Sequence, residues 1–364
     1  MKQNEKDLFK QLCSFKKNTF DETLLEAATP TVLGYLFFNR MQSIAYGKLT
    51  MFGLLGKVNR EFRNSLRSAH EQNVRKNKSF YRCVKYLHEV LQECNCKYAM
   101  LKGAYLFECY PEGYRTSNDI DLLISSGDVT TIGKALACAG FRQGSIKNGN
   151  FVPATRKEII ESRIMRGETV PYIKEINLPE IKFLEVDLNF SLDYKPGDTS
   201  LVEEMLKKSV LREVNGLNLY TLCDEDFFIH LCSHLYKEAT TLPWIEMKRD
   251  MTMYKYCDIY MLLEDVSEEK TSLLFKRARE IKMEKICAFC ILQMAELFDF
   301  NNLLVVDLAN QILSDDKDFL HTIISPSEHK SYIFSERNIC ERFFADDRVE
   351  FVKEINNEKI TNEE

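Results

Sequence analysis

Two aspartates, Asp119 and Asp121, open a segment that alternates polar and apolar residues and then becomes wholly apolar, DIDLLI. On a β-strand, residues i and i+2 point to the same face, about 6.6 Å apart along the strand. Two carboxylates this close repel each other, so one would have its pKa raised and take a proton unless a cation lay between them. Because hard oxygen ligands suit Mg²⁺, the pair indicates a divalent-metal site. A D-x-D pair on its own also occurs on solvated strand edges.

A third carboxylate stands in the alternating segment FLEVDLNF at 183–190. Its apolar residues face one side, while Glu185 and Asp187 face the other. If this strand lies beside the first, Asp187 joins Asp119 and Asp121 in the cluster that two-metal nucleotidyl transfer requires. Asp119 and Asp121 would hold both ions, and Asp187 would complete the ion nearer the acceptor hydroxyl and help to take its proton. Glu185 is the alternative for this role, and an exposed acid on an edge strand is the structural alternative for Asp187.

Residues ahead of the aspartate pair are suited to contacts with phosphate. Lys102-Gly103 lies sixteen residues before Asp119, at a turn from a short apolar strand into a helix. A glycine there lets the backbone approach a phosphate closely, and the N–H groups at a helix start favour anions. The planar fork of an arginine can bind a triphosphate, with a surface arginine as the equal alternative. We therefore predict a nucleotide-binding set that comprises Lys102, Gly103, Ala104, Arg115 and Asn118.

The composition sets limits on the class of protein. Of the 364 residues, 45% are hydrophobic and 29% are charged, which is ordinary for a globular protein. The formal net charge of −6 disfavours a general nucleic-acid binder, because phosphate neutralisation requires a basic excess. No apolar run approaches the ~20 residues of a membrane helix, and the polar N-terminus lacks the apolar stretch of a signal peptide. We expect a cytoplasmic protein without membrane contacts.

The elements that must position the site follow from the spacing of the apolar residues. Helical spacing precedes the site, for example at Val84, Leu87 and Leu91. Short strand and helix patterns follow, with a charged loop over 148–168 and a hairpin built from 170–176 and 181–192. Beyond the hairpin the chain becomes helical again, and the strongest segments span 224–237, 251–263 and 271–298. We predict an α+β fold in which a small mixed β-sheet is flanked by N-terminal and C-terminal helical regions.

These patterns suggest four regions. They are an N-terminal helical region (1–98), a catalytic core (99–200), a C-terminal helical domain (201–345) and a flexible acidic tail (346–364). All the predicted site residues fall in the core.

The segment LKGAYL at 101–106, with YPEGYRTSNDIDLL at 110–123, resembles the signature of an uncharacterised nucleotidyltransferase family in the polymerase-beta-like superfamily. That family has a leucine-lysine-glycine turn, a tyrosine-proline step, an arginine and paired aspartates. Its third carboxylate comes from a later strand, which is similar to EVDLNF at 185–190. Helices on both sides extend the resemblance. This chain departs from the superfamily at Ala104, where many relatives have serine or glycine, and from the family at Asn189, where histidine is usual.

The resemblance implies a metal-dependent nucleotidyltransferase that moves a nucleoside monophosphate from an NTP to a hydroxyl and releases pyrophosphate. Two Mg²⁺ ions, with Mn²⁺ as the alternative metal, would be held by Asp119, Asp121 and Asp187. The acceptor would be a small molecule or a protein, since the acidic net charge disfavours a nucleic acid. The alternative is an inactive member of the same fold that binds a nucleotide or a partner.

Other residues carry weaker signals. His230 and His234 stand at i, i+4 on a helix, a spacing that can hold zinc, but no third ligand accompanies them and packing is the favoured interpretation. Asp258 lies on an otherwise apolar helix and is either a partnered core acid or part of the nucleotide pocket. Cys287 and Cys290 form a C-x-x-C within an apolar stretch, and we interpret the twelve cysteines as reduced thiols.

Overall fold

The computed structural model describes residues 1–192, 199–298, 300–325 and 330–355. Contacts within the chain divide it into two compact units, Thr19–His230 and the combination of Met1–Asn18 with Leu231–Glu364. This division differs from the four regions drawn from the sequence, whose boundaries stay a prediction. The predicted carboxylates and nucleotide-binding residues all belong to the unit Thr19–His230, which is called the sheet unit below.

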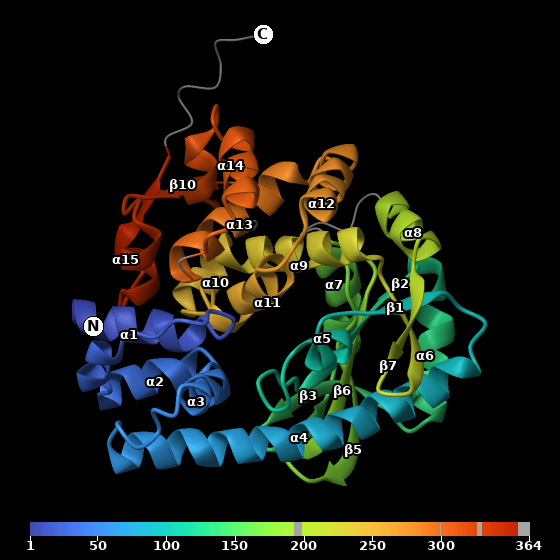
Figure 1. Ribbon diagram of the computed structural model, residues 1–364. Coiled ribbons are helices and arrows are strands. Elements are labelled where there is room, and N and C mark those ends of the chain that lie inside the picture. The colour runs from blue at the N-terminus through green and yellow to red at the C-terminus, as the bar shows by residue number, and fades with distance from the viewer. Residues whose placement is uncertain (193–198, 299, 326–329, 356–364) are drawn as a thin grey trace. The chain divides into compact units, whose positions relative to one another are not determined.

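An eight-stranded mixed sheet forms the centre of the sheet unit (Figure 1). Its strand order is β4-β3-β5-β6-β2-β1-β8-β7. The strands are β1 (Tyr98–Met100), β2 (Asp119–Ile124), β3 (Arg142–Lys147), β4 (Asn150–Pro153), β5 (Tyr172–Leu178), β6 (Ile181–Asn189), β7 (Val210–Val214) and β8 (Leu217–Thr221). The pairs β2–β6 and β1–β8 are parallel, and the other pairs are antiparallel. The predicted mixed sheet and the predicted hairpin, which is β5–β6, are confirmed.

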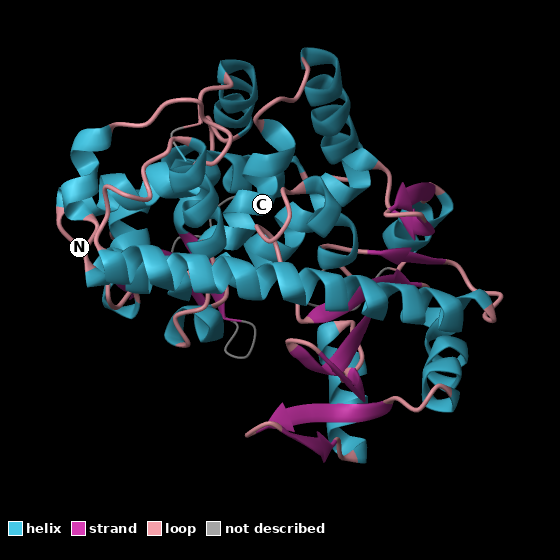
Figure 2. Cartoon of the chain, turned by 60° about the horizontal axis from the view of Figure 1, so that its bottom comes forward, coloured by secondary structure: helices cyan, strands magenta, loops and turns pink. Residues whose placement is uncertain are grey.

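The sheet unit also contains several helices. They are η1 (Glu22–Ala27), α2 (Pro30–Phe38), α3 (Gln42–Met51), α4 (Arg60–Gln92), α5 (Gly103–Cys109), η2 (Ser126–Asp128), α6 (Val129–Cys138), α7 (Arg156–Arg166) and α8 (Ser200–Lys207). The helix α4 is uninterrupted over 33 residues (Figure 2). It begins at the N-cap Asn59, whose side chain accepts a hydrogen bond from the Phe62 N–H at 2.8 Å.

The apolar core of the sheet unit lies between one face of the sheet and the helices α4 and α6. The predicted spacing of Val84, Leu87 and Leu91 is confirmed, because all three are fully buried in this core. From the sheet, Ile120 and Val186 enter the same core. Since side chains alternate along a strand, the residues next to them must point to the opposite face.

The charged segment 148–168 is not the loop that the sequence suggested. It contains β4 and the helix α7. A capping box starts α7, in which Thr155 and Glu158 satisfy each other's backbone N–H groups. This T-x-x-E signal is present in the sequence, but the high charge of the segment obscured it.

The stretch after residue 201 is also not wholly helical, because β7 and β8 form a hairpin that extends the sheet. The turn between them is Asn215-Gly216, and both residues have positive φ, 49° and 80°. Such Asn-Gly turns match the twist of a two-residue hairpin. The flanking strands are too short for their alternation to stand out from helical spacing.

The second unit is mainly helical. The helix α9 (Asp224–Ala239) begins in the sheet unit and ends in the second unit. The other helices of the second unit are α1 (Gln3–Cys13), α10 (Leu242–Glu246), α11 (Met253–Leu263), α12 (Glu268–Glu280), α13 (Glu284–Phe298), α14 (Leu303–Ile312), η3 (Lys317–His321), α15 (Ile339–Phe344) and η4 (Val349–Phe351). Its small sheet consists of β9 (Thr322–Ser325), β10 (Lys330–Phe334) and β11 (Val352–Glu354). The helix predicted over 271–298 is two helices, because Lys282 takes a φ of 59° between α12 and α13. The small sheet was not predicted. Of the expected tail, β11 pairs with β10, and residues 356–364 lie outside the described residues.

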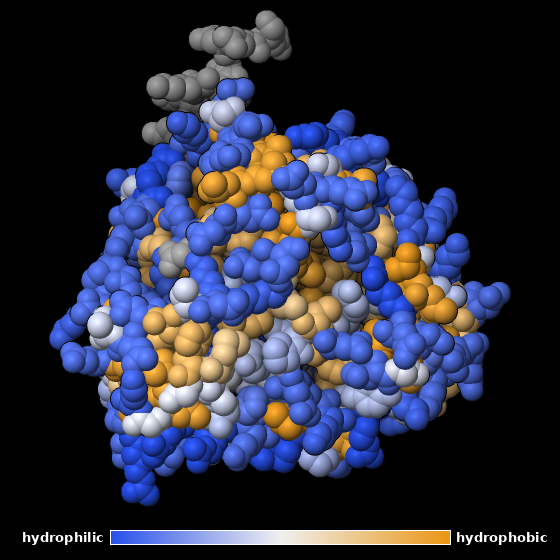
Figure 3. All heavy atoms as spheres, viewed as in Figure 1, coloured by the Kyte–Doolittle hydropathy of each residue, from blue (hydrophilic) through white to orange (hydrophobic). Residues whose placement is uncertain are grey.

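Within the described ranges, the chain contains no helix that combines the length and the apolar character needed to cross a bilayer. The face in Figure 3 carries hydrophobic patches separated by hydrophilic residues.

Candidate active site

The strands β2 and β6 lie side by side in parallel and bring the predicted carboxylates together (Figure 1). Asp119 pairs with Glu185, and Asp121 pairs with Asp187. Paired residues on neighbouring strands share a face, and the strands are about 4.8 Å apart. The four carboxylates therefore form one patch on the sheet face opposite the apolar core. We call these four residues the carboxylate patch.

Burial and neighbouring acids raise the pKa values of three residues in the carboxylate patch. Burial raises the pKa of Asp121, and Asp119 adds to the rise while Lys102 opposes it. Burial raises the pKa of Asp187 well above its ordinary value, with further contributions from Asp121 and Asp119. Burial and the neighbouring Asp119 also raise the pKa of Glu185. These shifts mean that additional positive charge would stabilise the ionised carboxylates.

Lys102 supplies one positive charge to the carboxylate patch. Its Nζ donates to Asp121 Oδ1 at 3.0 Å. Burial alone would lower the pKa of Lys102, but Asp121 and Asp119 outweigh burial and raise it, so the ammonium stays charged. The backbone of Lys102 has φ 38° and ψ −112°, a combination that L-residues rarely adopt. The turn thus places this lysine at a conformational cost, which is common at functional sites.

Gly103 allows the turn to pack against the segment that leads into β2. A Cβ at Gly103 would lie 2.6 Å from both Cβ and Oγ of Ser117. Ser117 Oγ in turn donates to Asp119 Oδ1 at 2.9 Å. Gly103 therefore helps to orient Asp119 through Ser117. The next N–H along the chain, that of Ala104, already donates to the Leu101 carbonyl at 3.2 Å.

Arg115 and Asn118 belong to a group of polar side chains around Lys76 on α4, which also includes Arg40, two residues beyond the end of α2. Lys76 on α4 donates from Nζ to Asn118 Oδ1. Burial lowers the pKa of Lys76, and the nearby Arg40 and Arg115 lower it further, while Asp119 opposes them. Arg115 is itself buried. We call Arg40, Lys76 and Arg115 the cationic group; sequence reasoning found only Arg115.

Two more side chains lie close to the carboxylate patch. The Asn189 side chain donates to the carbonyls of Leu122 and Asp187, both at 3.5 Å, and its proximity lowers the pKa of Asp121, so this departure from the family's usual histidine retains polar contacts. His230 is 7% exposed, and burial, with a smaller effect of Lys102, lowers its pKa to about 3. Neither ring nitrogen of His230 has a hydrogen-bond partner within the described ranges. His230 is therefore a neutral, buried imidazole near Lys102.

The remaining candidates belong to the second unit. His234 lies 3.5 Å from Glu238, four residues further along α9. Asp258 is 4% exposed on α11 and has a partner. Cys287 and Cys290 are buried free thiols. None of these observations links them to the carboxylate patch.

The oxygen atoms of the carboxylate patch are the kind of ligand that suits a hard divalent cation, but the side chains do not form a metal site in this structure. Throughout the described part of the chain, no three His, Cys, Asp or Glu side chains form a group that could hold a metal ion. Asp121 instead accepts from Lys102, and Asp119 accepts from Ser117. Four oxygen-donor side chains and one lysine leave excess negative charge, which suits Mg²⁺ or Mn²⁺.

The chain is similar to a known family and to a solved structure. A family model described as uncharacterised nucleotidyltransferase matches residues 27–299, which are 273 of the 364 residues. A search of curated proteins finds no match. Among solved structures, the chain is similar to an antigenic nucleotidyltransferase-like protein from Paracoccidioides brasiliensis, at 14% identity and a TM-score of 0.31, over 58% of this chain and 92% of that one.

The family match covers every residue of the carboxylate patch and of the predicted nucleotide-binding set. It defines the class of the protein as a nucleotidyltransferase. The chain belongs to the family of uncharacterised nucleotidyltransferases.

Proposed function

We propose that the carboxylate patch binds divalent metal and transfers a nucleoside monophosphate from an NTP to a hydroxyl. The observation that carries this proposal is the register that places Asp119 and Asp121 beside Glu185 and Asp187. A patch of carboxylates on a rigid sheet suits a reaction in which the protein mainly positions reactants and neutralises charge. Asp119, Asp121 and Asp187 would hold the metal, which supplies Lewis-acid stabilisation of the phosphate charge.

The triphosphate would be bound by the lysine and arginine side chains around the carboxylate patch. Lys102 lies within hydrogen-bond distance of Asp121, and Lys76 of the cationic group lies near Asp119. Arginine offers a planar fork to phosphate oxygens, whereas lysine acts as a point charge. Asn118, which Lys76 contacts, would orient this lysine. Gly103 and Ala104 contribute by shaping the turn that holds Lys102.

The chemical step follows from this arrangement. The acceptor oxygen forms a bond to the α-phosphorus, the bond from that phosphorus to the bridging oxygen breaks, and pyrophosphate leaves with the electron pair. The acceptor proton passes to Asp187. Asp187 is the proposed base because it lies beside Asp121 in the carboxylate patch. Glu185, on the same face, is the alternative base.

The acceptor is a small molecule or a protein hydroxyl. Incubation with Mg²⁺, each α-labelled NTP and a panel of hydroxyl compounds and peptides should release pyrophosphate and label one acceptor class. Asp121→Asn should lower the rate by about 10²-fold or more, because it removes a charged group from the reacting centre. Equal rates in Asp121→Asn, or no turnover by folded protein across the panel, would reject the proposal and favour an inactive binding protein.

A further inference from the structure

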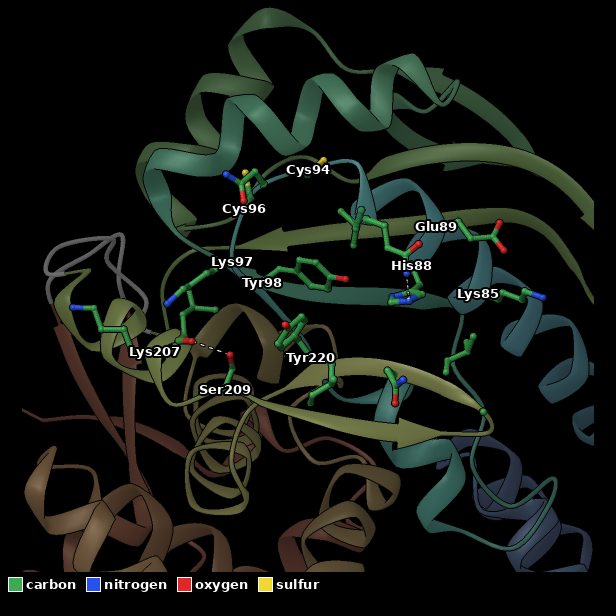
Figure 4. A pocket seen from close by; sticks show the side chains of 18 residues that line it. Lys85, His88, Glu89, Cys94, Cys96, Lys97, Tyr98, Lys207, Ser209 and Tyr220 are labelled. Carbon is green, nitrogen blue, oxygen red and sulfur yellow. Dashed lines mark hydrogen bonds between the residues drawn. The ribbon is translucent and has the colours of Figure 1, made fainter.

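A large cavity in the sheet unit lies apart from the carboxylate patch. It has a volume of about 1050 Å³ and is lined by the C-terminal part of α4, the start of β1, the end of α8 and the β7–β8 hairpin (Figure 4). The residue Tyr98 in its lining pairs with Ile124, at the end of β2 remote from Asp119. Asp119 and Ile124 are five residues apart, about 16 Å along a strand. Ile124 also points into the apolar core, on the opposite face from the carboxylates.

Two tyrosines meet in the middle of this cavity (Figure 4). The rings of Tyr98 and Tyr220 are 6.1 Å apart between centroids and make an angle of 80°. Tyr98 is buried, whereas Tyr220 is 47% exposed. An edge-to-face contact of this kind stabilises the orientation of the outer ring. Tyr220 thus offers an aromatic surface whose position is fixed by a buried neighbour.

Charged side chains stand on either side of the tyrosines. Lys97 and Lys207 lie together on one side, and Lys85 lies with Glu89 on the other (Figure 4). Three lysines against one glutamate give the lining a positive balance. This contrasts with the net charge of −6 of the whole chain, so the cavity is a local basic site on an acidic protein.

We propose that this cavity is a second ligand site, which binds a nucleoside phosphate without metal. An aromatic face stacks on a planar base whatever its identity, and lysine pairs with phosphate through charge-assisted hydrogen bonds. The base would stack on Tyr220, and the phosphate would meet Lys97 and Lys207. The volume of about 1050 Å³ slightly exceeds the roughly 300–1,000 Å³ that small-molecule sites occupy, so a mononucleotide fits. A free nucleotide and the phosphorylated end of an oligonucleotide share this chemistry, and the proposed ligand is the free nucleotide.

The test is equilibrium dialysis of labelled AMP against the full chain in EDTA, which removes the divalent metal that the carboxylate patch would need. Wild type should bind AMP, and Tyr220→Ala should weaken binding by about 5- to 150-fold through lost stacking. Tyr220→Phe should bind as wild type does, because it keeps the ring. Asp121→Asn should also bind AMP normally.

Charge variants supply a matched control. Lys207→Glu should weaken AMP binding, whereas Lys208→Glu, an exposed neighbour outside the lining, should leave it unchanged. Circular dichroism of each variant checks that the fold is kept. Absence of AMP binding by folded wild type would overturn the proposal, as would binding that is lost in Asp121→Asn or unaffected by Tyr220→Ala. Binding of a 5′-phosphorylated oligonucleotide with none of AMP would overturn the assignment to a free nucleotide.

Discussion

At the scale of single residues, the site depends on an imbalance of charge. The carboxylate patch brings four acids together, and Lys102 offsets only part of their charge. Burial raises the pKa of Asp187, and the neighbouring Asp121 and Asp119 raise it further. The cationic group adds positive charge nearby, since its member Lys76 interacts electrostatically with Asp119. The two groups together match the needs of a metal-bound triphosphate.

Lys76 provides the clearest test of the cationic group. Lys76→Met should raise the KM for NTP about 10-fold or more, with a smaller change in kcat, because a charged hydrogen bond to phosphate contributes about 1.5–3 kcal/mol. Steady-state kinetics of pyrophosphate release would measure both constants. Lys78→Met, an exposed lysine two residues along α4, is the control and should behave as wild type. An unchanged KM in Lys76→Met would remove this lysine from the phosphate site.

The site residues differ in how visible they were in the sequence. Asp119 and Asp121 were predicted from strand geometry, and Asp187 was predicted from alternation. The pairing of β2 with β6 brings the three residues together, and their roles are predictions. Lys76 could not be found, because it lies 43 residues before Asp119 on a helix whose polar face carries many charged residues. Nothing in local spacing distinguishes the one lysine that reaches Asn118. Such contacts depend on how α4 packs against the chain around residue 113, where Asn73 donates to the Gly113 carbonyl at 3.1 Å.

At the scale of elements, the turn from β1 into α5 determines how the segment before β2 packs. Gly103 and Ser117 approach so closely that no side chain fits at position 103. Asp119 accepts the Ser117 hydroxyl at the end of this chain of contacts. The position of Asp119 thus depends on a glycine from another element.

Gly103→Ala should therefore destabilise the sheet unit by about 1–3 kcal/mol, as overpacking does. Urea unfolding would measure the loss. Gly56→Ala is the matched control, because a Cβ there meets nothing within 4 Å. Ser117→Gly should rescue Gly103→Ala in part, since it removes the clashing Cβ and the two sites are coupled. If the two alanine variants have the same stability, the close packing of the turn is not what requires Gly103.

The same scale explains which elements the sequence concealed. The central strands β2 and β6 were predicted because each has a long alternating or apolar pattern. The hairpin β7–β8 was missed, although Asn215-Gly216 is a strong turn signal, because its strands have only five residues each. The helix α7 was missed because its many charged residues are also typical of a loop, although the Thr155–Glu158 capping box indicates a helix start. Local turn and capping signals would have corrected both errors.

At the scale of the whole molecule, the chain comprises two compact units, and the second has its own stabilising contacts. Asp250 is fully buried and accepts hydrogen bonds from Nε and Nη2 of Arg348, at 2.6 to 3.0 Å. This pair connects the segment between α10 and α11 with the residue just before η4. A buried pair of this kind is costly to break, because the remaining charge has no partner.

Arg348→Met should lower the free energy of unfolding of the second unit by about 3–5 kcal/mol. Trp244, the one tryptophan of the chain, lies in α10 of this unit, so its fluorescence during urea unfolding reports the change. Arg337→Met breaks an exposed pair with Asp318 and should cost less than about 1 kcal/mol. Equal effects of the two substitutions would contradict the importance of the buried pair.

Titration with Mn²⁺ followed by electron paramagnetic resonance would show whether the carboxylate patch binds divalent metal. Without nucleotide, wild type should bind at least one Mn²⁺ per chain, and Asp121→Asn should lose this ion while keeping its fold. Glu161→Gln, which alters an exposed acid on α7, should bind as wild type does. No bound Mn²⁺ in wild type, or the same binding in Asp121→Asn, would contradict the proposed metal binding.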